Sequence, residues 1–173
     1  MDNTREHLQT YLADHLAGAR AALELIAHLR DHAADQALRS VMADVHEDIE
    51  FDRLALERLV RLVGASPHPV KDISAWLAER LGRLKLGAMG GTLDGLPQLE
   101  AVEAVALGIV GKVKLWDVLM TLGATGMDGA GLPGLKERAL EQHGRVERER
   151  KRLAAAVFGR PAERSAVTAD AAL

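Results

Sequence analysis

Four polar side chains stand in the middle of otherwise apolar stripes in this sequence: His15, Asp52, Lys112 and Gln142. A buried aspartate or lysine destabilises a protein unless it is paired, so such residues tend to gather in one place. Together they supply an imidazole, a carboxylate, an ammonium and an amide, which are groups used for proton transfer and for buried hydrogen-bond networks. We therefore predict one buried polar layer formed by these four side chains.

The four polar residues of the predicted layer lie on four different predicted helices. Apolar residues recur every three or four positions along the chain, and glycine and proline interrupt this pattern at a few places. We expect helices at residues 4–29, 36–63, 98–122 and 135–158. If these helices form two antiparallel hairpins, with the second and third helices parallel, counting residues places the four polar positions at nearly one height.

The connection between the two hairpins is long. Residues 64–69 contain two prolines, residues 70–86 form a shorter amphipathic segment, and a glycine-rich stretch follows to residue 97. Two hairpins joined by a connection that carries its own helix are typical of ferritin-like four-helix bundles with one crossover. We expect an all-α bundle of this kind over residues 1–158, followed by a flexible C-terminal tail over residues 159–173.

The third expected long helix, residues 98–122, is apolar nearly all round, which indicates a central position or a subunit interface. Small residues line one side of it: Ala101, Ala104, Gly108 and Gly111. A glycine inside a helix costs about 1 kcal/mol relative to alanine, so these glycines need an explanation. Close packing within the bundle and the seam of a two-fold homodimer, on this helix or on the crossover, are the two alternatives.

Four further side chains are secondary candidates for the layer: Tyr11, Asp48, Glu103 and His143. Tyr11 and Asp48 each precede a member of the layer by one helical turn. His143 is next to Gln142 in the sequence, and Glu103 has apolar neighbours on its helix. Tyr11 either donates a hydrogen bond to the layer or only fills the core.

The sequence does not favour a metal centre. A dinuclear site in such a bundle needs a Glu-x-x-His pair on each of two helices, and this chain contains no Glu-x-x-His. The chain also has no cysteine, which excludes zinc–thiolate sites and disulfides. A lysine ammonium in the layer would repel a cation. We predict no cofactor; if iron, manganese or zinc does bind, His15 and Asp52 are its candidate ligands.

The composition of the chain bears on two questions: whether the protein binds nucleic acid and where in the cell it is located. The chain has 22 Lys and Arg against 25 Asp and Glu, a net charge of -3, so we expect no attraction to nucleic acid. The most apolar stretch, residues 99–122, contains five charged side chains, and the N-terminus lacks the pattern of a secretory signal. We therefore expect a cytoplasmic protein without a transmembrane segment.

Four segments resemble segments of other proteins: residues 11–18 (YLADHLAG), 48–53 (DIEFDR), 76–86 (WLAERLGRLKL) and 107–112 (LGIVGK). They are similar to those of a group of uncharacterised bacterial proteins that are ferritin-like four-helix bundles. The similarity covers most of residues 8–157. It implies a fold and names no reaction, and the ligands of true ferritins cannot be transferred to this chain.

Three hypotheses for the function follow. The first is a non-enzymatic structural or partner-binding bundle, because no nucleophile motif or phosphate-binding loop occurs, although an Asp–His pair could serve as a general base. Its polar layer would either only set the register of the helices or replace a cofactor site. The second is a metal-binding or redox protein that uses His15, Asp52 and nearby acidic residues. The third, a small-molecule binder, requires a cavity of roughly several hundred Å³ that reaches His15.

Overall fold

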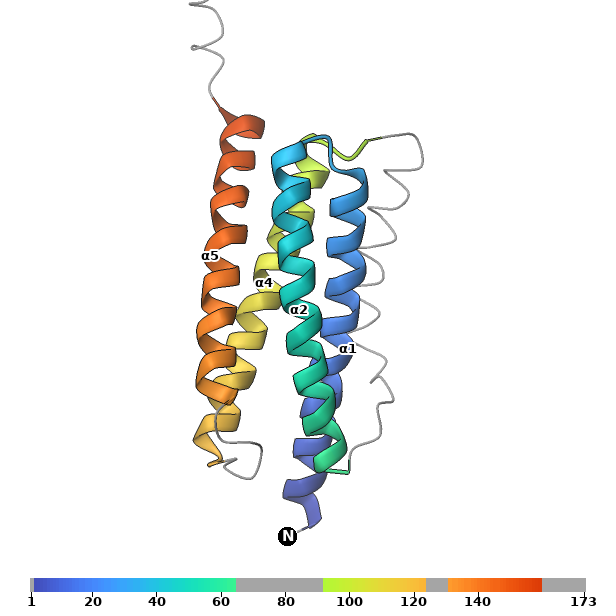
Figure 1. Cartoon of the computed structure of the whole chain (residues 1–173), viewed down its shortest axis with the longest axis vertical. Coiled ribbons are helices and arrows are strands. Elements are labelled where there is room, and N and C mark those ends of the chain that lie inside the picture. The colour runs from blue at the N-terminus through green and yellow to red at the C-terminus, as the bar shows by residue number, and fades with distance from the viewer. Residues whose placement is uncertain (1, 65–91, 124–130, 160–173) are drawn as a thin grey trace, which may run out of the picture.

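Four long α-helices make up most of the described chain. The computed structural model describes residues 2–64, 92–123 and 131–159 (Figure 1). The helices are α1 (Asp2–His32), α2 (Gln36–Leu62), α4 (Gly95–Thr121) and α5 (Gly131–Phe158). No strand is formed within these ranges beyond one isolated bridge. The prediction of an all-α four-helix protein is therefore confirmed, while the predicted crossover helix and C-terminal tail lie outside the described residues.

The helices form two antiparallel hairpins, α1 with α2 and α4 with α5 (Figure 1). Backbone hydrogen bonds tie the start of α4 to the turn between α1 and α2. Ala34 N donates to Leu93 O at 2.9 Å, and Leu93 N donates to His32 O at 2.7 Å. Since α2 begins at this turn and runs away from it, α2 and α4 are parallel. The end of α2 and the start of α4 therefore lie at opposite ends of the bundle.

The turn between the first two helices is shorter than expected, because α1 continues to His32. Asp35 then begins α2 by accepting hydrogen bonds at its Oδ1 from Ala37 N at 2.8 Å and Leu38 N at 3.3 Å. This side chain satisfies two backbone donors that have no partner in the first turn of the helix.

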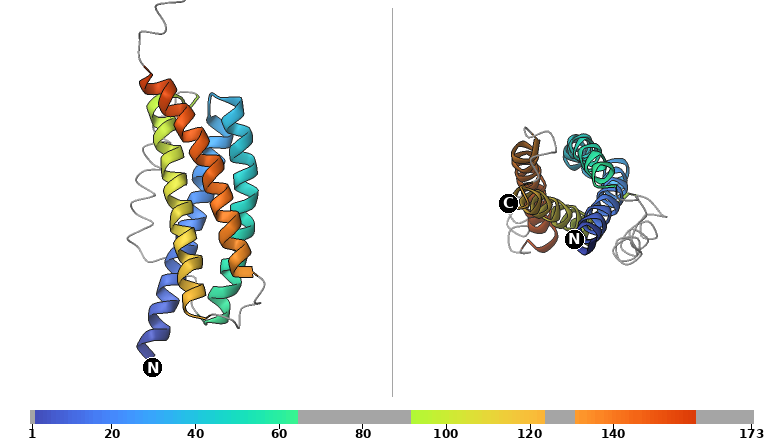
Figure 2. Two further views of the ribbon diagram at one scale, coloured as in Figure 1. Left: turned by 90° about the vertical axis from the view of Figure 1, so that its left-hand side faces the viewer. Right: turned by 90° about the horizontal axis from the view of Figure 1, so that it is seen from below.

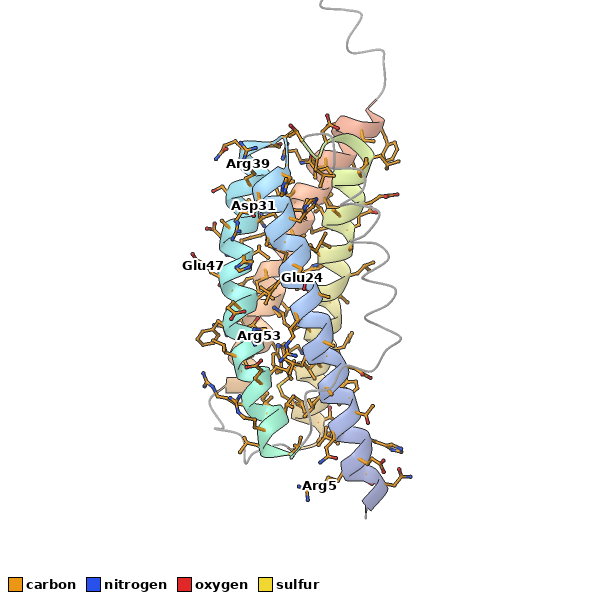
Figure 3. All side chains as sticks on the ribbon, turned by 90° about the vertical axis from the view of Figure 1, so that its right-hand side faces the viewer. Arg5, Glu24, Asp31, Arg39, Glu47 and Arg53 are labelled. Carbon is orange, nitrogen blue, oxygen red and sulfur yellow. The ribbon has the colours of Figure 1, made fainter. Side chains whose placement is uncertain are left out.

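The other end of this hairpin is closed by α1. Gln9 Nε2 donates to Val63 O at 2.8 Å, and Arg5, labelled at the N-terminal end of α1 in Figure 3, donates to the same carbonyl oxygen. This carbonyl follows the last turn of α2 and would otherwise lack a partner. The two ends together hold α1 and α2 in register.

The start of α5 corrects a predicted boundary. Residues 123–134 are rich in glycine and were expected to form a loop, yet α5 begins at Gly131. Pro133 lies in the first turn, where a proline is tolerated because the backbone donors there have no partner within the helix. Leu132 packs against the core, and this burial offsets the low helix propensity of the flanking glycines.

Each described helix packs against two neighbours, and those of α4 are α1 and α5. The end-on view in Figure 2 shows α4 between these two helices. Twelve of its residues are buried, in agreement with its nearly uniform apolar character. Four of its large apolar side chains are nevertheless exposed in the described structure: Leu96, Leu107, Val110 and Val118. None of the described helices has an apolar stretch long enough to cross a membrane.

Candidate functional site

Three of the predicted layer residues meet between α2, α4 and α5. Lys112 Nζ donates to Asp52 Oδ2 at 2.6 Å and to Gln142 Oε1. Gln142 Nε2 donates to the same Asp52 Oδ2 at 3.1 Å, which closes a triangle of hydrogen bonds. The side chains of Asp52 and Lys112 are 1% and 13% exposed, and Gln142 is fully buried. The three polar groups therefore satisfy one another away from water.

Arg138 of α5 adds a second cation to the layer. Its Nε lies 3.0 Å and its Nη2 2.8 Å from Asp52 Oδ1, and its Cζ lies 4.1 Å from the centre of the Phe51 ring. We did not predict Arg138, because an arginine beside an apolar stripe usually points into solvent. Its spacing of four residues from Gln142 places it on the same helix face, and this was the available signal.

The environment of the layer acts on the ammonium of Lys112. Burial lowers the pKa of Lys112, and the neighbouring Asp52 carboxylate opposes this shift through its charge and its hydrogen bond. The guanidinium of Arg138 lowers the pKa further. Removal of Asp52 would therefore leave a desolvated ammonium beside a second positive charge.

His15 lies beside the hydrogen-bonded triangle rather than within it. Its ring packs edge-to-face against Tyr11, with ring centroids 4.6 Å apart. No hydrogen bond joins the His15 ring to another described residue. The reason is its position on α1, whereas the triangle forms where α2, α4 and α5 meet. Tyr11 likewise packs against the core and makes no hydrogen bond to the layer within the described chain.

The remaining secondary candidates lie at the edge of the layer or away from it. Asp48 accepts a hydrogen bond from Arg145 on α5, and its side chain is 29% exposed. Glu103 lies 3.4 Å from Arg150 in an ion pair and is not buried, because Leu107 and Val110, one and two turns further along the same face of α4, are themselves exposed. His143 is half-buried and makes no hydrogen bond to the triangle. The structure thus brings neither Glu103 nor His143 into the layer.

A cavity of about 360 Å³ lies between α1, α2 and α4 and reaches the layer. Its polar side chains come from one part of each helix: Tyr11, Asp14, His15, Asp52, Arg53 and Lys112. Small and apolar side chains form much of the remaining wall, among them Ala19, Ala22, Leu25, Ala104 and Val105. The cavity has the size and the contact with His15 that the small-molecule hypothesis requires.

Glycines keep this cavity open. Gly18 on α1 and Gly108 and Gly111 on α4 all line it. A Cβ added at any of the three would meet no neighbouring described atom within 4 Å. No described neighbour packs against Gly108 or Gly111, and Gly108 is exposed, so these glycines do not serve close packing between the described helices.

Two polar atoms on residues that line the cavity are buried without a hydrogen-bond partner among the described residues. They are Oδ1 of Asp14, an acceptor, and Nε1 of Trp116, a donor. The side chain of Trp116 is fully buried. An unpaired buried polar atom costs about 1–3 kcal/mol, so such atoms in a native protein call for an explanation.

The layer is poorly suited to a metal ion. The described residues contain no group of three or more His, Asp or Glu side chains that could hold one. Asp52 already accepts hydrogen bonds from Lys112, Arg138 and Gln142, and the two cations would repel a metal ion at this carboxylate. The chemistry of the described site is therefore hydrogen bonding and apolar contact.

His15 makes folding sensitive to pH. Burial lowers its pKa below the ordinary value of 6.5, and the Asp14 carboxylate opposes the shift only in part. The unfolded chain therefore binds a proton at His15 more readily than the folded protein, so stability falls as the pH drops below 6.5 toward the folded-state pKa. We expect His15→Gln to lose this contribution, measured by urea unfolding between about pH 7.5 and about pH 5. An unchanged pH dependence in the variant would contradict the assignment.

Comparison with known proteins does not assign a family to this chain. No protein-family model, no curated protein and no solved structure matches it. The resemblance to ferritin-like bacterial proteins stays a prediction from the four sequence segments. The function is therefore argued from the geometry of the layer and the cavity.

Proposed function

We propose that this protein is a ferritin-like four-helix bundle that binds a small, largely apolar molecule in the cavity and catalyses no reaction on it. The parallel course of α2 and α4, with the start of α4 tied to the first hairpin, supports the ferritin-like arrangement. The similar segments in the sequence support it as well. The cytoplasmic location predicted from the sequence is part of the same proposal.

The main support for ligand binding comes from the three glycines that line the cavity. Gly18, Gly108 and Gly111 lie inside helices, where each costs about 1 kcal/mol relative to alanine. An empty apolar space also weakens a core, because the atoms that line it lose dispersion contacts. Neither loss is explained by close helix packing, since an added Cβ would meet no described atom within 4 Å. A bound molecule would restore the missing contacts.

The polar layer supports binding without catalysis. Both oxygens of Asp52 accept hydrogen bonds from cations, so this carboxylate is not a free general base. The triangle instead joins α2 to α4 and α5, and two of its members, Asp52 and Lys112, line the cavity. Its first task is thus to hold the cavity-forming helices in register.

The proposal is tested with a neutral fluorescent probe, N-phenyl-1-naphthylamine. We expect saturable binding to the intact chain, and at least about tenfold weaker binding to Gly18→Leu and to Gly108→Leu, because the new side chain fills the space from either facing helix. Gly134→Leu on α5 is the matched control, since it is also a helical glycine with open space beside it but does not line the cavity.

The controls make the outcome decisive. Circular dichroism must show that all three variants keep the helical content of the native chain. Unsaturable dye binding, or equal affinity of the cavity variants and Gly134→Leu, would refute the cavity as the binding site.

Two hypotheses from the sequence stay predictions beside this proposal. A homodimer through α4 or through the crossover is one, and the exposed Leu107 and Val118 on α4 are consistent with the first of these. The second is a metal or redox protein that uses His15 and Asp52. Stoichiometric iron, manganese or zinc in protein purified without chelator would support the metal hypothesis, and sedimentation velocity would measure the oligomeric state.

A further inference from the structure

We infer that the molecule bound in the cavity is an uncharged, elongated amphiphile: an apolar chain that ends in a hydroxyl group. The inference rests on the proposed function and adds the chemical class of the ligand. It follows from the shape of the cavity, from the distribution of its polar side chains, and from the hydrogen-bonding groups that are left without partners.

The cavity is long. Tyr11 and Leu25 both line it, and at 1.5 Å per residue they stand about 21 Å apart along α1. The lining of the cavity thus follows α1 for about four helical turns. The shape therefore fits a chain-like molecule better than a compact ring system.

The polar side chains lie toward one end. α1 and α4 are antiparallel, and equal counts along both helices from the Ala33–Leu93 bridge bring His15 level with Lys112. Beyond these two residues, toward the bridge, the cavity is lined by apolar and small residues such as Ala22 and Val105. A ligand with an apolar chain and one polar end group matches this wall.

The charges at the polar end disfavour a charged ligand. Asp52 is paired with Lys112, and Arg53 is paired with two glutamates of its own helix. An anionic end group would meet the carboxylates of Asp52 and Asp14, and a cationic one would meet Lys112 and Arg53. An uncharged end group avoids both repulsions and is less costly to remove from water.

The unpaired atoms select a group that both donates and accepts a hydrogen bond. Trp116 Nε1 needs an acceptor, and Asp14 Oδ1 needs a donor. Lys112 uses two of its three N–H groups within the triangle. A hydroxyl can accept from Trp116 or Lys112 and donate to Asp14, whereas a ketone or ether oxygen only accepts. Neither Asp14 Oδ1 nor Trp116 Nε1 is exposed to the cavity when it is empty, so the ligand reaches these two atoms only if their side chains rotate.

Three probes with the same chain test the inference: octanol, octanoate and octylamine. The affinity of each probe is measured near neutral pH on the full chain, either by displacement of N-phenyl-1-naphthylamine or by calorimetric titration. We expect octanol to bind at least about tenfold more tightly than either charged probe. A charged probe that binds as tightly as octanol overturns the inference and leaves the proposed function standing. Failure of all three probes while the dye binds also overturns it. Failure of the dye and of all probes overturns the proposed function itself.

Two conservative variants locate the polar end group. Trp116→Phe keeps an aromatic side chain and removes the donor, so we expect octanol binding to weaken about fivefold more than dye binding does, which is the contribution of one neutral hydrogen bond. Asp14→Asn removes a negative charge at nearly constant size, so octanoate should bind more tightly and octylamine less tightly. Unchanged octanol affinity in Trp116→Phe, or unchanged affinity of both charged probes in Asp14→Asn, would refute the placement of the hydroxyl.

Discussion

Replacement of Asp52 by alanine should lower the free energy of unfolding by about 3–5 kcal/mol. The carboxylate is 1% exposed and accepts hydrogen bonds from Lys112, Arg138 and Gln142. Its removal would leave a buried ammonium without its counter-charge and beside a second cation. Urea unfolding followed by circular dichroism measures the change.

Two matched variants separate this effect from a general loss of packing. Asp48→Ala removes the partner of Arg145 one turn away, where the side chains are 29% and 35% exposed, and should cost less than about 1 kcal/mol. Adding Lys112→Met to Asp52→Ala should recover much of the lost stability, because no buried ammonium is then left unpaired. A loss below about 1 kcal/mol for Asp52→Ala would mean that water replaces the carboxylate.

Gln142→Leu should lower the free energy of unfolding by about 2–4 kcal/mol, although leucine is close to glutamine in size and more apolar. Gln142 is fully buried, accepts from Lys112 and donates to Asp52, so its replacement removes two hydrogen bonds to charged groups. Burial of the more apolar leucine side chain offsets only part of the stability lost with these two hydrogen bonds. The measurement is again urea unfolding.

Glu141→Leu is the control for Gln142→Leu, because Glu141 is the exposed neighbour on the same helix. It should change stability by less than about 0.5 kcal/mol. If Gln142→Leu instead stabilised the protein, the layer would be a site where polar groups are less favourable than an apolar core, and its role in holding the helices would have to be abandoned.

These effects matter because α2 and α5 pack against each other least extensively among the neighbouring helices. Polar contacts join these two helices: Asp52 binds Arg138 and Gln142, Asp48 binds Arg145, and Asp35 at the start of α2 pairs with Arg152. The most extensive contacts in the described bundle are those of α1 with α2 and of α4 with α5. We therefore expect loss of the layer to loosen the contact between the two hairpins before either hairpin unfolds.

Much of the fold was predictable, because helix formation and burial follow local spacing. The apolar stripes predicted four helices whose ends differ from the observed ones by a few residues. The largest differences lie at His32, Gly95 and Gly131, where the helices continue into polar or glycine-rich sequence. Packing against neighbouring helices stabilised these end turns, and local propensity does not contain that contribution.

The candidate site was predictable in part. Asp52, Lys112 and Gln142 interrupt apolar stripes, and the high energy of a buried unpaired charge implies that they meet. Arg138 carries no such signal, because a long cationic side chain beside a stripe reaches either solvent or the layer, and only the packing of α5 on α2 decides between them. For the same reason, periodicity placed His15 on the inner face of α1 but did not show that it faces the cavity instead of the triangle.

Residue spacing alone indicated a helical chain, the faces of the helices that are buried, and a shared layer for four polar residues, of which three form the hydrogen-bonded triangle. These properties depend on residue spacing and on the energy of burying a charge. The tertiary structure alone decided that Gly18, Gly108 and Gly111 border one cavity and that no neighbouring described side chain fills it. Empty space is a property of the distance between helices, and a sequence pattern records which residues face inward but not how closely they meet.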